Sequence, residues 1–190
     1  MRLLYTCFLF LFLNLFVYPD GLNAQETDWA LSKEEEGVRV YTRKIAGTDY
    51  KEVRSITTIA TSAEALLKIV NDYSRIEPWR FKVEEMKLLE GNPMGAHYLY
   101  FVLNLPVPFS DRDFILDIET KNQPDGSILI NFKAVSDKLP EKKGKIRMNM
   151  MKGFWKLSPK GANITEVTYQ YLSDPAGVPA WIVNLFSINA

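Results

Sequence analysis

Apolar and polar residues alternate along most of the chain beyond residue 37, a period of two that is typical of strands with one buried face. Two segments replace this period with helical spacing. One helix is predicted at residues 62–71, where Thr61 and Glu64 form a capping box, and a second is predicted to begin at Pro179. The predicted strands span residues 38–43, 50–59, 83–90, 96–105, 114–121, 127–135, 145–157 and 164–172.

Turn residues separate these strands by short distances, which predicts an antiparallel meander. With the two helices added, the fold class is α+β. Residues 72–79 are predicted as a short helical or turn segment, and a bend is expected at Gly153 inside the strand at 145–157.

One face of the predicted sheet is strongly apolar. In the strand at 96–105, every second residue after His97 is apolar, while Tyr98 and Asn104 fall on the other face. The same parity predicts the inward side chains Leu99, Phe101, Leu103, Leu105, Phe114, Leu116, Ile118, Ile146, Met148 and Met150. A curved sheet with this face is compatible with a filled core or with a cavity.

The first residues have the order of a secretory signal peptide. Arg2 precedes an apolar run of about 15 residues, short of the ~20 needed to span a bilayer, and a small-residue cleavage site follows at Ala24. We therefore expect residues 1–24 to be removed and residues 25–190 to form one domain. An uncleaved membrane anchor is the alternative.

Cysteine content and charge narrow the possible functions. Cys7 is the sole cysteine and lies in the predicted signal segment, so the mature chain would have no thiol. Export without disulfides favours a bacterial envelope, in the periplasm or outside the cell. The 23 basic and 23 acidic side chains cancel, and the densest basic cluster, residues 142–145, is predicted to be a solvated loop. We expect no nucleic-acid partner, because such a partner needs a basic face.

The last third of the chain carries several motifs in succession. A Gly-x-Trp strand begins at Gly153, a Thr-x-Val-x-Tyr strand follows at residues 165–169, and an Asp-Pro-Ala-Gly turn at residues 174–177 leads into the second helix. An Asp-Arg-Asp-Phe segment lies upstream at residues 111–114. From about Trp29 to its end, the chain resembles the START domain, the steroidogenic-acute-regulatory-protein-related lipid transfer domain.

This resemblance implies a helix-grip fold, in which a curved antiparallel sheet wraps around a C-terminal helix with one lipid or sterol between them. It implies non-covalent binding and transfer without a cofactor, by a monomer that meets membrane surfaces transiently. It also implies a closing helix that continues well beyond Ala190, so the helix is expected to be incomplete in this chain.

Parity and resemblance together predict which side chains contact the ligand. His97 and Arg112 are expected to orient it, although His97 fits equally a buried histidine satisfied by a neighbour, and Arg112 fits a structural ion pair with an adjacent aspartate. Residues 106–109 form either a gate that dips into a membrane or a stiff connection. The predicted apolar contacts are Leu99, Phe101, Leu103, Phe114, Leu116, Ile118, Met148, Met150 and Trp181.

Two other functions stay open: an enzyme of the same fold, such as a cyclase or hydrolase acting on a hydrophobic substrate, and an envelope interaction module with a filled core. We expect no enzyme, because a Ser-His-Asp set would depend on His97, the sole histidine, and the chain has no Gly-x-Ser-x-Gly segment. We also expect no zinc site, because one histidine and no mature cysteine supply too few of the usual zinc ligands.

Overall fold

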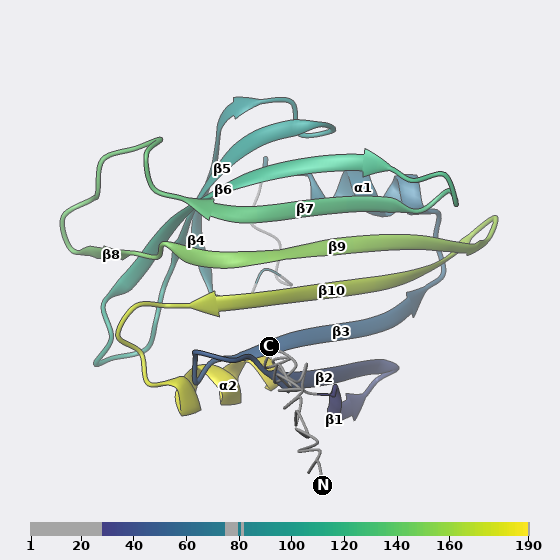
Figure 1. Ribbon diagram of the computed structural model, residues 1–190. Helices are drawn as coiled ribbons and strands as arrows, with labels where there is room; N and C mark the ends of the chain where they lie inside the picture. The colour runs from purple at the N-terminus through teal and green to yellow at the C-terminus, as the bar shows by residue number, and fades with distance from the viewer. Residues whose placement is uncertain (1–27, 75–79, 81, 190) are drawn as a thin grey trace, which may run out of the picture.

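The computed structural model describes residues 28–74, 80 and 82–189, which form one strongly curved sheet with two helices on its concave side (Figure 1). The predicted signal segment and most of residues 72–79 lie outside the described residues. The elements are β1 (Ala30–Glu35), β2 (Val38–Lys44), β3 (Lys51–Ile59), α1 (Ala63–Val70), β4 (Val83–Gly91), β5 (Ala96–Leu103), β6 (Asp111–Asn122), β7 (Ile128–Val135), β8 (Lys145–Arg147), β9 (Met150–Gly161), β10 (Ile164–Asp174) and α2 (Ala180–Asn189).

The sheet has the order β1-β2-β3-β10-β9-β7-β6-β5-β4, and β8 pairs in parallel with β6. Most ladders join strands that follow one another in the chain, as expected for the predicted meander. The pairing of β3 with β10 departs from a simple meander, because the chain leaves β3 through α1 and re-enters the sheet at its far edge with β4. An early strand, β3, and the last strand, β10, are therefore neighbours, and α2 lies next to β3 (Figure 1).

The start of α1 lies one residue later than predicted. Ser62 is the N-cap, because its hydroxyl accepts a hydrogen bond from the Ala65 amide at 3.2 Å. The carbonyl of Thr61 instead accepts from the Thr165 hydroxyl at 2.8 Å, which ties the start of the helix to β10.

Two strand predictions need correction. Strand β1 was not predicted, because its residues are mostly exposed and therefore show no apolar alternation. The predicted strand at 145–157 is two strands, β8 and β9, and the chain breaks between Arg147 and Met150 rather than at Gly153. Gly153 lies inside β9, where a Cβ atom would meet the Gln170 backbone oxygen and come within 2.7 Å of the Phe132 ring, so close packing requires glycine there.

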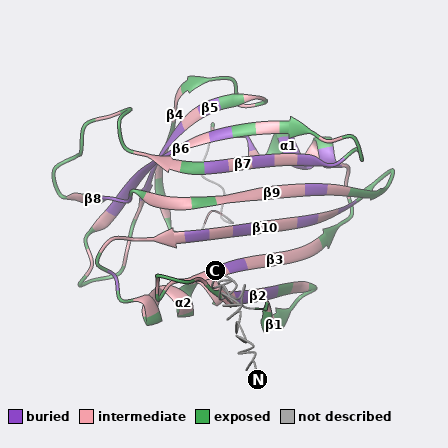
Figure 2. Ribbon diagram, in the orientation of Figure 1, coloured by how far each residue is buried: buried purple, intermediate pink, exposed green. Residues whose placement is uncertain are grey.

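The main core lies on the concave face, where α1 covers one end of the sheet. Leu66 and Leu67 of α1 pack with buried side chains of β5, β6 and β7. In Figure 2 the buried residues lie along the middle of these strands, whereas β1 and the strand ends are exposed.

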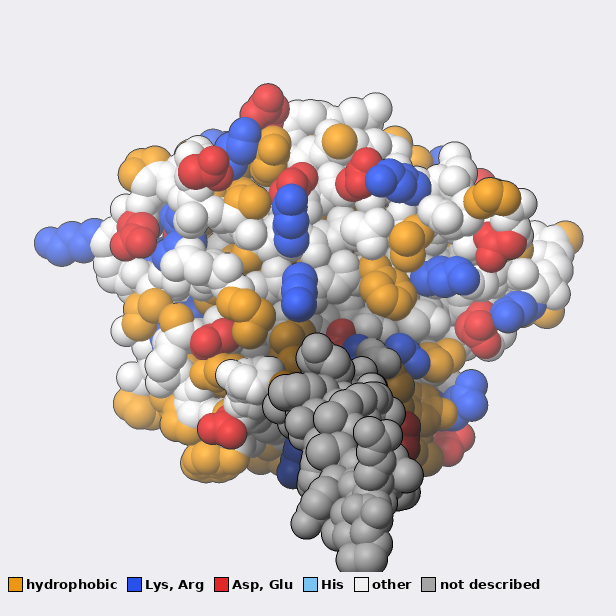
Figure 3. Space-filling model, in the orientation of Figure 1, with side chains coloured by type: hydrophobic (Ala, Val, Ile, Leu, Met, Phe, Trp, Pro, Cys, Tyr) orange, Lys and Arg blue, Asp and Glu red, His pale blue; other side chains and the backbone are white. Residues whose placement is uncertain are grey.

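A second, smaller cluster lies on the outer face of the sheet. Tyr100, Val102 and Ile115 are buried there beneath the β7–β8 loop, which contributes Leu139. The Arg147 side chain, buried with Asp113, donates to both carboxylate oxygens at 2.9 and 3.0 Å, and also donates to the Leu139 carbonyl at 3.1 Å. This ion pair fastens the loop to the outer face. Elsewhere on the face shown in Figure 3, basic and acidic side chains are interspersed.

Candidate functional site

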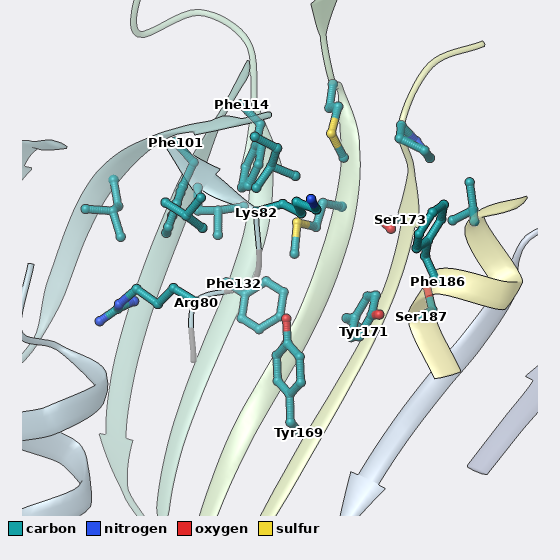
Figure 4. A pocket seen from close by; sticks show the side chains of 18 of the residues that line it. Arg80, Lys82, Phe101, Phe114, Phe132, Tyr169, Tyr171, Ser173, Phe186 and Ser187 are labelled. Carbon is teal, nitrogen blue, oxygen red and sulfur yellow. The ribbon is translucent and has the colours of Figure 1, made fainter. Parts of the chain in front are cut away.

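A cavity of about 470 Å³ lies between the concave face of the sheet and α2 (Figure 4). Strands β5, β6, β7, β9 and β10 supply most of its wall, and α2 supplies Ile182, Val183 and Phe186. Phe101 and Phe114 stack in this wall, with ring centroids 5.0 Å apart. A largely apolar cavity of this size, partly open to solvent, suits a small hydrophobic molecule.

Seven of the eleven predicted ligand contacts line the cavity: Leu99, Phe101, Leu103, Phe114, Leu116, Ile118 and Met148. Cross-strand pairing explains why they meet, because Leu99 lies opposite Leu116 and directly paired residues share a face. Contact with a ligand stays a prediction for all seven. The other four, His97, Arg112, Met150 and Trp181, lie outside the cavity wall.

His97 is buried behind the wall rather than in it. Its Nε2 lies 2.8 Å from the hydroxyl of Tyr73, which does line the cavity. The single Tyr73 proton is donated to Asn71 Oδ1 at 2.9 Å, so Nε2–H of His97 donates to the Tyr73 oxygen. Burial lowers the pKa of His97 and raises the pKa of Tyr73, which keeps both side chains neutral.

Arg112 holds the loop that leads into α2. Its guanidinium donates to the carbonyls of Pro175 and Ala176, both at 2.7 Å, and to the Ser110 carbonyl. The expected ion pair with an adjacent aspartate does not form, because Asp113 pairs with Arg147 and Asp111 pairs with Lys145. The expected ligand contact stays a prediction, although Arg112 lies outside the cavity wall. The side chain is buried, and backbone oxygens satisfy it.

Met150 lies off the cavity because of the break between β8 and β9. Met150 pairs with Asp174, whereas Met151 pairs with Ser173, and it is this second pair that lines the cavity. The prediction continued the alternation from Met148 to Met150 as if the strand were unbroken. Because β8 ends at Arg147 and β9 begins at Met150, the alternation does not continue across the gap. Ile146, also predicted to point inward, is 40% exposed.

Trp181 points away from the cavity and is 70% exposed. The neighbouring turn of α2 places Ile182, Val183 and Phe186 inward. Because α2 is apolar around most of its circumference, its sequence gives no preference for either side.

Three aromatic side chains of β9 and β10 form part of the cavity wall and were not predicted from the sequence. Trp155 stacks on Tyr169 with ring centroids 4.1 Å apart, and Tyr171 follows at 5.0 Å from Tyr169. Tyr169 and Tyr171 both line the pocket in Figure 4. Burial raises the pKa of both tyrosines, so both hydroxyls stay protonated. Their alternation along β10 was a sufficient signal, because Tyr169, Tyr171 and Ser173 share one parity.

Polar contacts attach α2 and the loop before it to β3 and the β2–β3 loop. The Tyr50 hydroxyl donates to the Val178 carbonyl at 3.0 Å. Asn184 accepts from the Lys51 amide at 2.9 Å and donates to the Asp49 carbonyl at 3.2 Å. No residue of α2 is fully buried, so these bonds and the Arg112 contacts determine where the helix lies.

The chemistry available at the wall is limited. Among the described residues, those that line the cavity include no histidine, cysteine, aspartate or glutamate. The same part of the chain contains no cluster of three or more residues suited to hold a metal ion. Within it there is also no helix of the length and apolar character needed to cross a membrane.

A curved antiparallel sheet that closes on a C-terminal helix around an apolar cavity defines the helix-grip class. A family model, the START domain, matches residues 19–188. The chain belongs to the START family.

Individual relatives agree with this assignment. An uncharacterized protein of Pseudomonas aeruginosa is 36% identical over 169 residues, which cover 88% of this chain and 83% of the relative. The phosphatidylcholine transfer protein of Bos taurus is 24% identical over 170 residues, covering 85% of this chain and 78% of that protein.

Solved structures share the fold. The crystal structure of a STAR-related lipid transfer protein fragment from Xanthomonas axonopodis is similar with a TM-score of 0.78 and 31% identity, over 85% of this chain and 90% of that one. Human STARD10 has a TM-score of 0.75 at 22% identity, over 85% of this chain and 67% of its own, and shows the fold alone.

Proposed function

We propose that this protein binds one lipid or another hydrophobic small molecule, such as a sterol-like compound, in the cavity beneath α2 and carries it without altering it. The observation that carries this proposal is the largely apolar cavity of about 470 Å³ between the sheet and α2. Each Å² of apolar ligand surface buried there contributes about 25 cal/mol, so area alone can hold an acyl chain or a ring system.

The composition of the wall supports binding rather than catalysis. The described lining residues offer hydroxyl groups, one amide and two cations, but none of the carboxylate, imidazole or thiol groups that usually serve as general acids, bases or nucleophiles. The raised pKa of Tyr169 makes its phenol a poor acid. Hydrogen bonds from such groups orient a ligand.

Exposed apolar side chains beside the cavity support a transient contact with a membrane surface. Trp181 and Leu185 of α2 point outward, and Val107 in the β5–β6 loop is 94% exposed. Phe186 is partly exposed and also lines the cavity, so this apolar surface reaches the wall. Surfaces of this kind mark interaction sites, and a lipid carrier needs one where its cargo enters.

We further propose that the protein works in a bacterial envelope, either in the periplasm or outside the cell. The signal-like order of residues 1–24 and the absence of cysteine after residue 7 support this location. Expression of the full chain followed by fractionation and N-terminal sequencing tests both export and cleavage.

Native mass spectrometry of the purified protein, followed by extraction of any bound lipid, tests the binding function. We expect a stoichiometric ligand in the wild type. Met148→Trp should reduce occupancy at least about fivefold, because the indole fills space that the ligand needs. Met150→Trp is the matched control and should leave occupancy unchanged, since Met150 lies outside the cavity wall.

The proposal is wrong if the protein remains free of ligand after exposure to a mixture of neutral, zwitterionic and anionic lipids. Equal loss of binding in Met148→Trp and Met150→Trp, with wild-type thermal stability in both, would place the ligand elsewhere.

A further inference from the structure

Strand β10 and helix α2 present hydroxyl groups to the cavity. Tyr169, Tyr171 and Ser173 alternate along β10 and line the cavity, and Ser187 lines it from α2. Across the β3–β10 ladder, Ser55 lies opposite Tyr169 and also lines the cavity. Two strands and a helix thus bring hydroxyl groups to a wall that is otherwise mainly apolar.

Three of these side chains lie together where α2 meets β10. In Figure 4, Tyr171, Ser173 and Ser187 lie on the α2 side of the pocket. The Ser187 hydroxyl is close enough to the phenol of Tyr171 to lower its pKa. We call these three residues the hydroxyl cluster. Because each hydroxyl can both donate and accept, the cluster can hydrogen-bond an oxygen atom of a ligand placed among them.

The surroundings of the hydroxyl cluster favour uncharged groups. A nearby cation favours a phenolate, and Arg80 acts in this way on Tyr73, whose pKa it lowers against the larger effect of burial. For Tyr171, burial raises the pKa, the Ser187 hydroxyl opposes it, and no cation of the described residues contributes. Surroundings that disfavour a phenolate also disfavour a carboxylate or a phosphate, because a buried anion needs a partner of opposite charge.

We propose that the hydroxyl cluster binds an uncharged oxygen of the ligand, in a hydroxyl or an ester carbonyl, and that the cavity therefore selects neutral amphiphiles. The inference rests on the function proposed above and specifies its ligand class. A few polar groups in an apolar wall fix the orientation of a ligand. The apolar part of the ligand then extends towards Phe101 and Phe114, on the other side of the pocket in Figure 4.

The position of the hydroxyl cluster also connects the ligand to the closing helix. Ser187 belongs to α2, whereas Tyr171 and Ser173 belong to β10. A ligand oxygen bound among them therefore bridges the helix and the sheet.

Competition binding against Nile red with four ligands of similar chain length tests the preference. Dodecanol and methyl dodecanoate offer an uncharged oxygen, and chlorododecane replaces the hydroxyl by chlorine. Dodecanoate is the anion at about pH 8. We expect the delipidated protein to bind dodecanol or methyl dodecanoate at least about tenfold more tightly than dodecanoate. The tighter of these two neutral ligands identifies the oxygen as that of a hydroxyl or of an ester.

Tyr171→Phe should weaken binding of the preferred neutral ligand about fivefold and leave chlorododecane binding unchanged, because it deletes one hydrogen bond and keeps the ring. Ser187→Ala should act in the same direction. Tyr41→Phe is the matched control, since it removes the same hydroxyl from a residue of β2 outside the cavity wall. Thermal unfolding of all three variants checks that they fold.

Equal effects of Tyr171→Phe and Tyr41→Phe on the preferred neutral ligand would overturn the role of the hydroxyl cluster while leaving the lipid-binding function intact. The same would follow if Tyr171→Phe weakened chlorododecane binding equally, or if dodecanoate bound as tightly as the neutral ligands. Failure of the wild type to bind any of the four ligands would instead count against the proposed function, and this inference would fall with it.

Discussion

His97 influences the cavity through Tyr73. The histidine is 2% exposed and donates its Nε2 proton to the tyrosine oxygen, which positions a hydroxyl that lines the cavity. Burial favours the neutral ring and outweighs the backbone hydrogen bonds to Gly95 and Asn92, which favour the protonated ring. The surroundings of His97 therefore penalise its protonation.

This penalty makes stability depend on pH. Burial lowers the pKa of His97 below its ordinary value of 6.5, so the unfolded chain takes up a proton at a higher pH than the folded protein does. The free energy of unfolding should fall as the pH drops below about 6.5, and His97 should have no effect above it. Urea unfolding between about pH 5 and pH 8 measures the slope, and His97→Gln should flatten it.

His97 is the sole histidine, which makes the comparison clean. Carboxylates such as Asp125, whose pKa is lowered by hydrogen bonds from Ser127, titrate below this window. An unchanged slope in His97→Gln would show that another group is responsible.

Parity predicted the apolar wall at single-residue level but did not predict the polar groups. Leu99 and Phe101 followed correctly because alternation is strict within a hydrogen-bonded strand. The ion pair expected for Arg112 was wrong, because its partners are the carbonyls of Pro175 and Ala176, more than sixty residues away in the chain. Nothing in the local sequence reveals such partners.

At the scale of elements, most strands and both helices were predicted close to their observed bounds. The failures have physical causes. Strand β1 has almost no buried side chain to create a pattern, and the break between β8 and β9 contains neither proline nor glycine. Helix α2 was expected from Pro179, but its inward side was decided by contacts with β3 and the β2–β3 loop.

These contacts should control how fast cargo leaves. Removing the side-chain amide of Asn184 deletes the bonds to Lys51 and Asp49, each worth about 1 kcal/mol. If α2 must move for exit, Asn184→Ala should accelerate ligand release about fivefold or more. Transfer of a fluorescent lipid to acceptor vesicles measures the rate.

Asn189→Ala is the appropriate control, because the Asn189 amide bonds only to Leu185 within α2, at 2.9 Å, among the described contacts. Both variants replace asparagine by alanine in the same helix. Equal release rates for Asn184→Ala and wild type would mean that cargo leaves by another route.

At the scale of the whole molecule, the sheet surrounds a space that its own side chains do not fill. Apolar cavities left empty cost stability, because their lining atoms lose contacts. A ligand that binds only the folded state restores these contacts and adds its own binding free energy. The folded protein should therefore be least stable when empty.

We expect the melting temperature of the delipidated protein to rise continuously with the concentration of a binding lipid. The gain is about 2.7 kcal/mol at a free concentration one hundred times the dissociation constant. Differential scanning fluorimetry across a lipid titration measures it, with Met148→Trp as a variant that should respond less. A melting temperature independent of lipid concentration would contradict ligand binding to the native state.

The outer cluster has a consequence for the loading and release of a ligand under the function proposed above. Tyr100, Val102 and Ile115 occupy two of the strands that form the cavity wall, β5 and β6, but point the opposite way, under a loop held by Asp113 and Arg147. Their packing does not depend on whether the cavity is occupied. These outward contacts should therefore hold the register of β5 and β6 while a ligand enters and leaves.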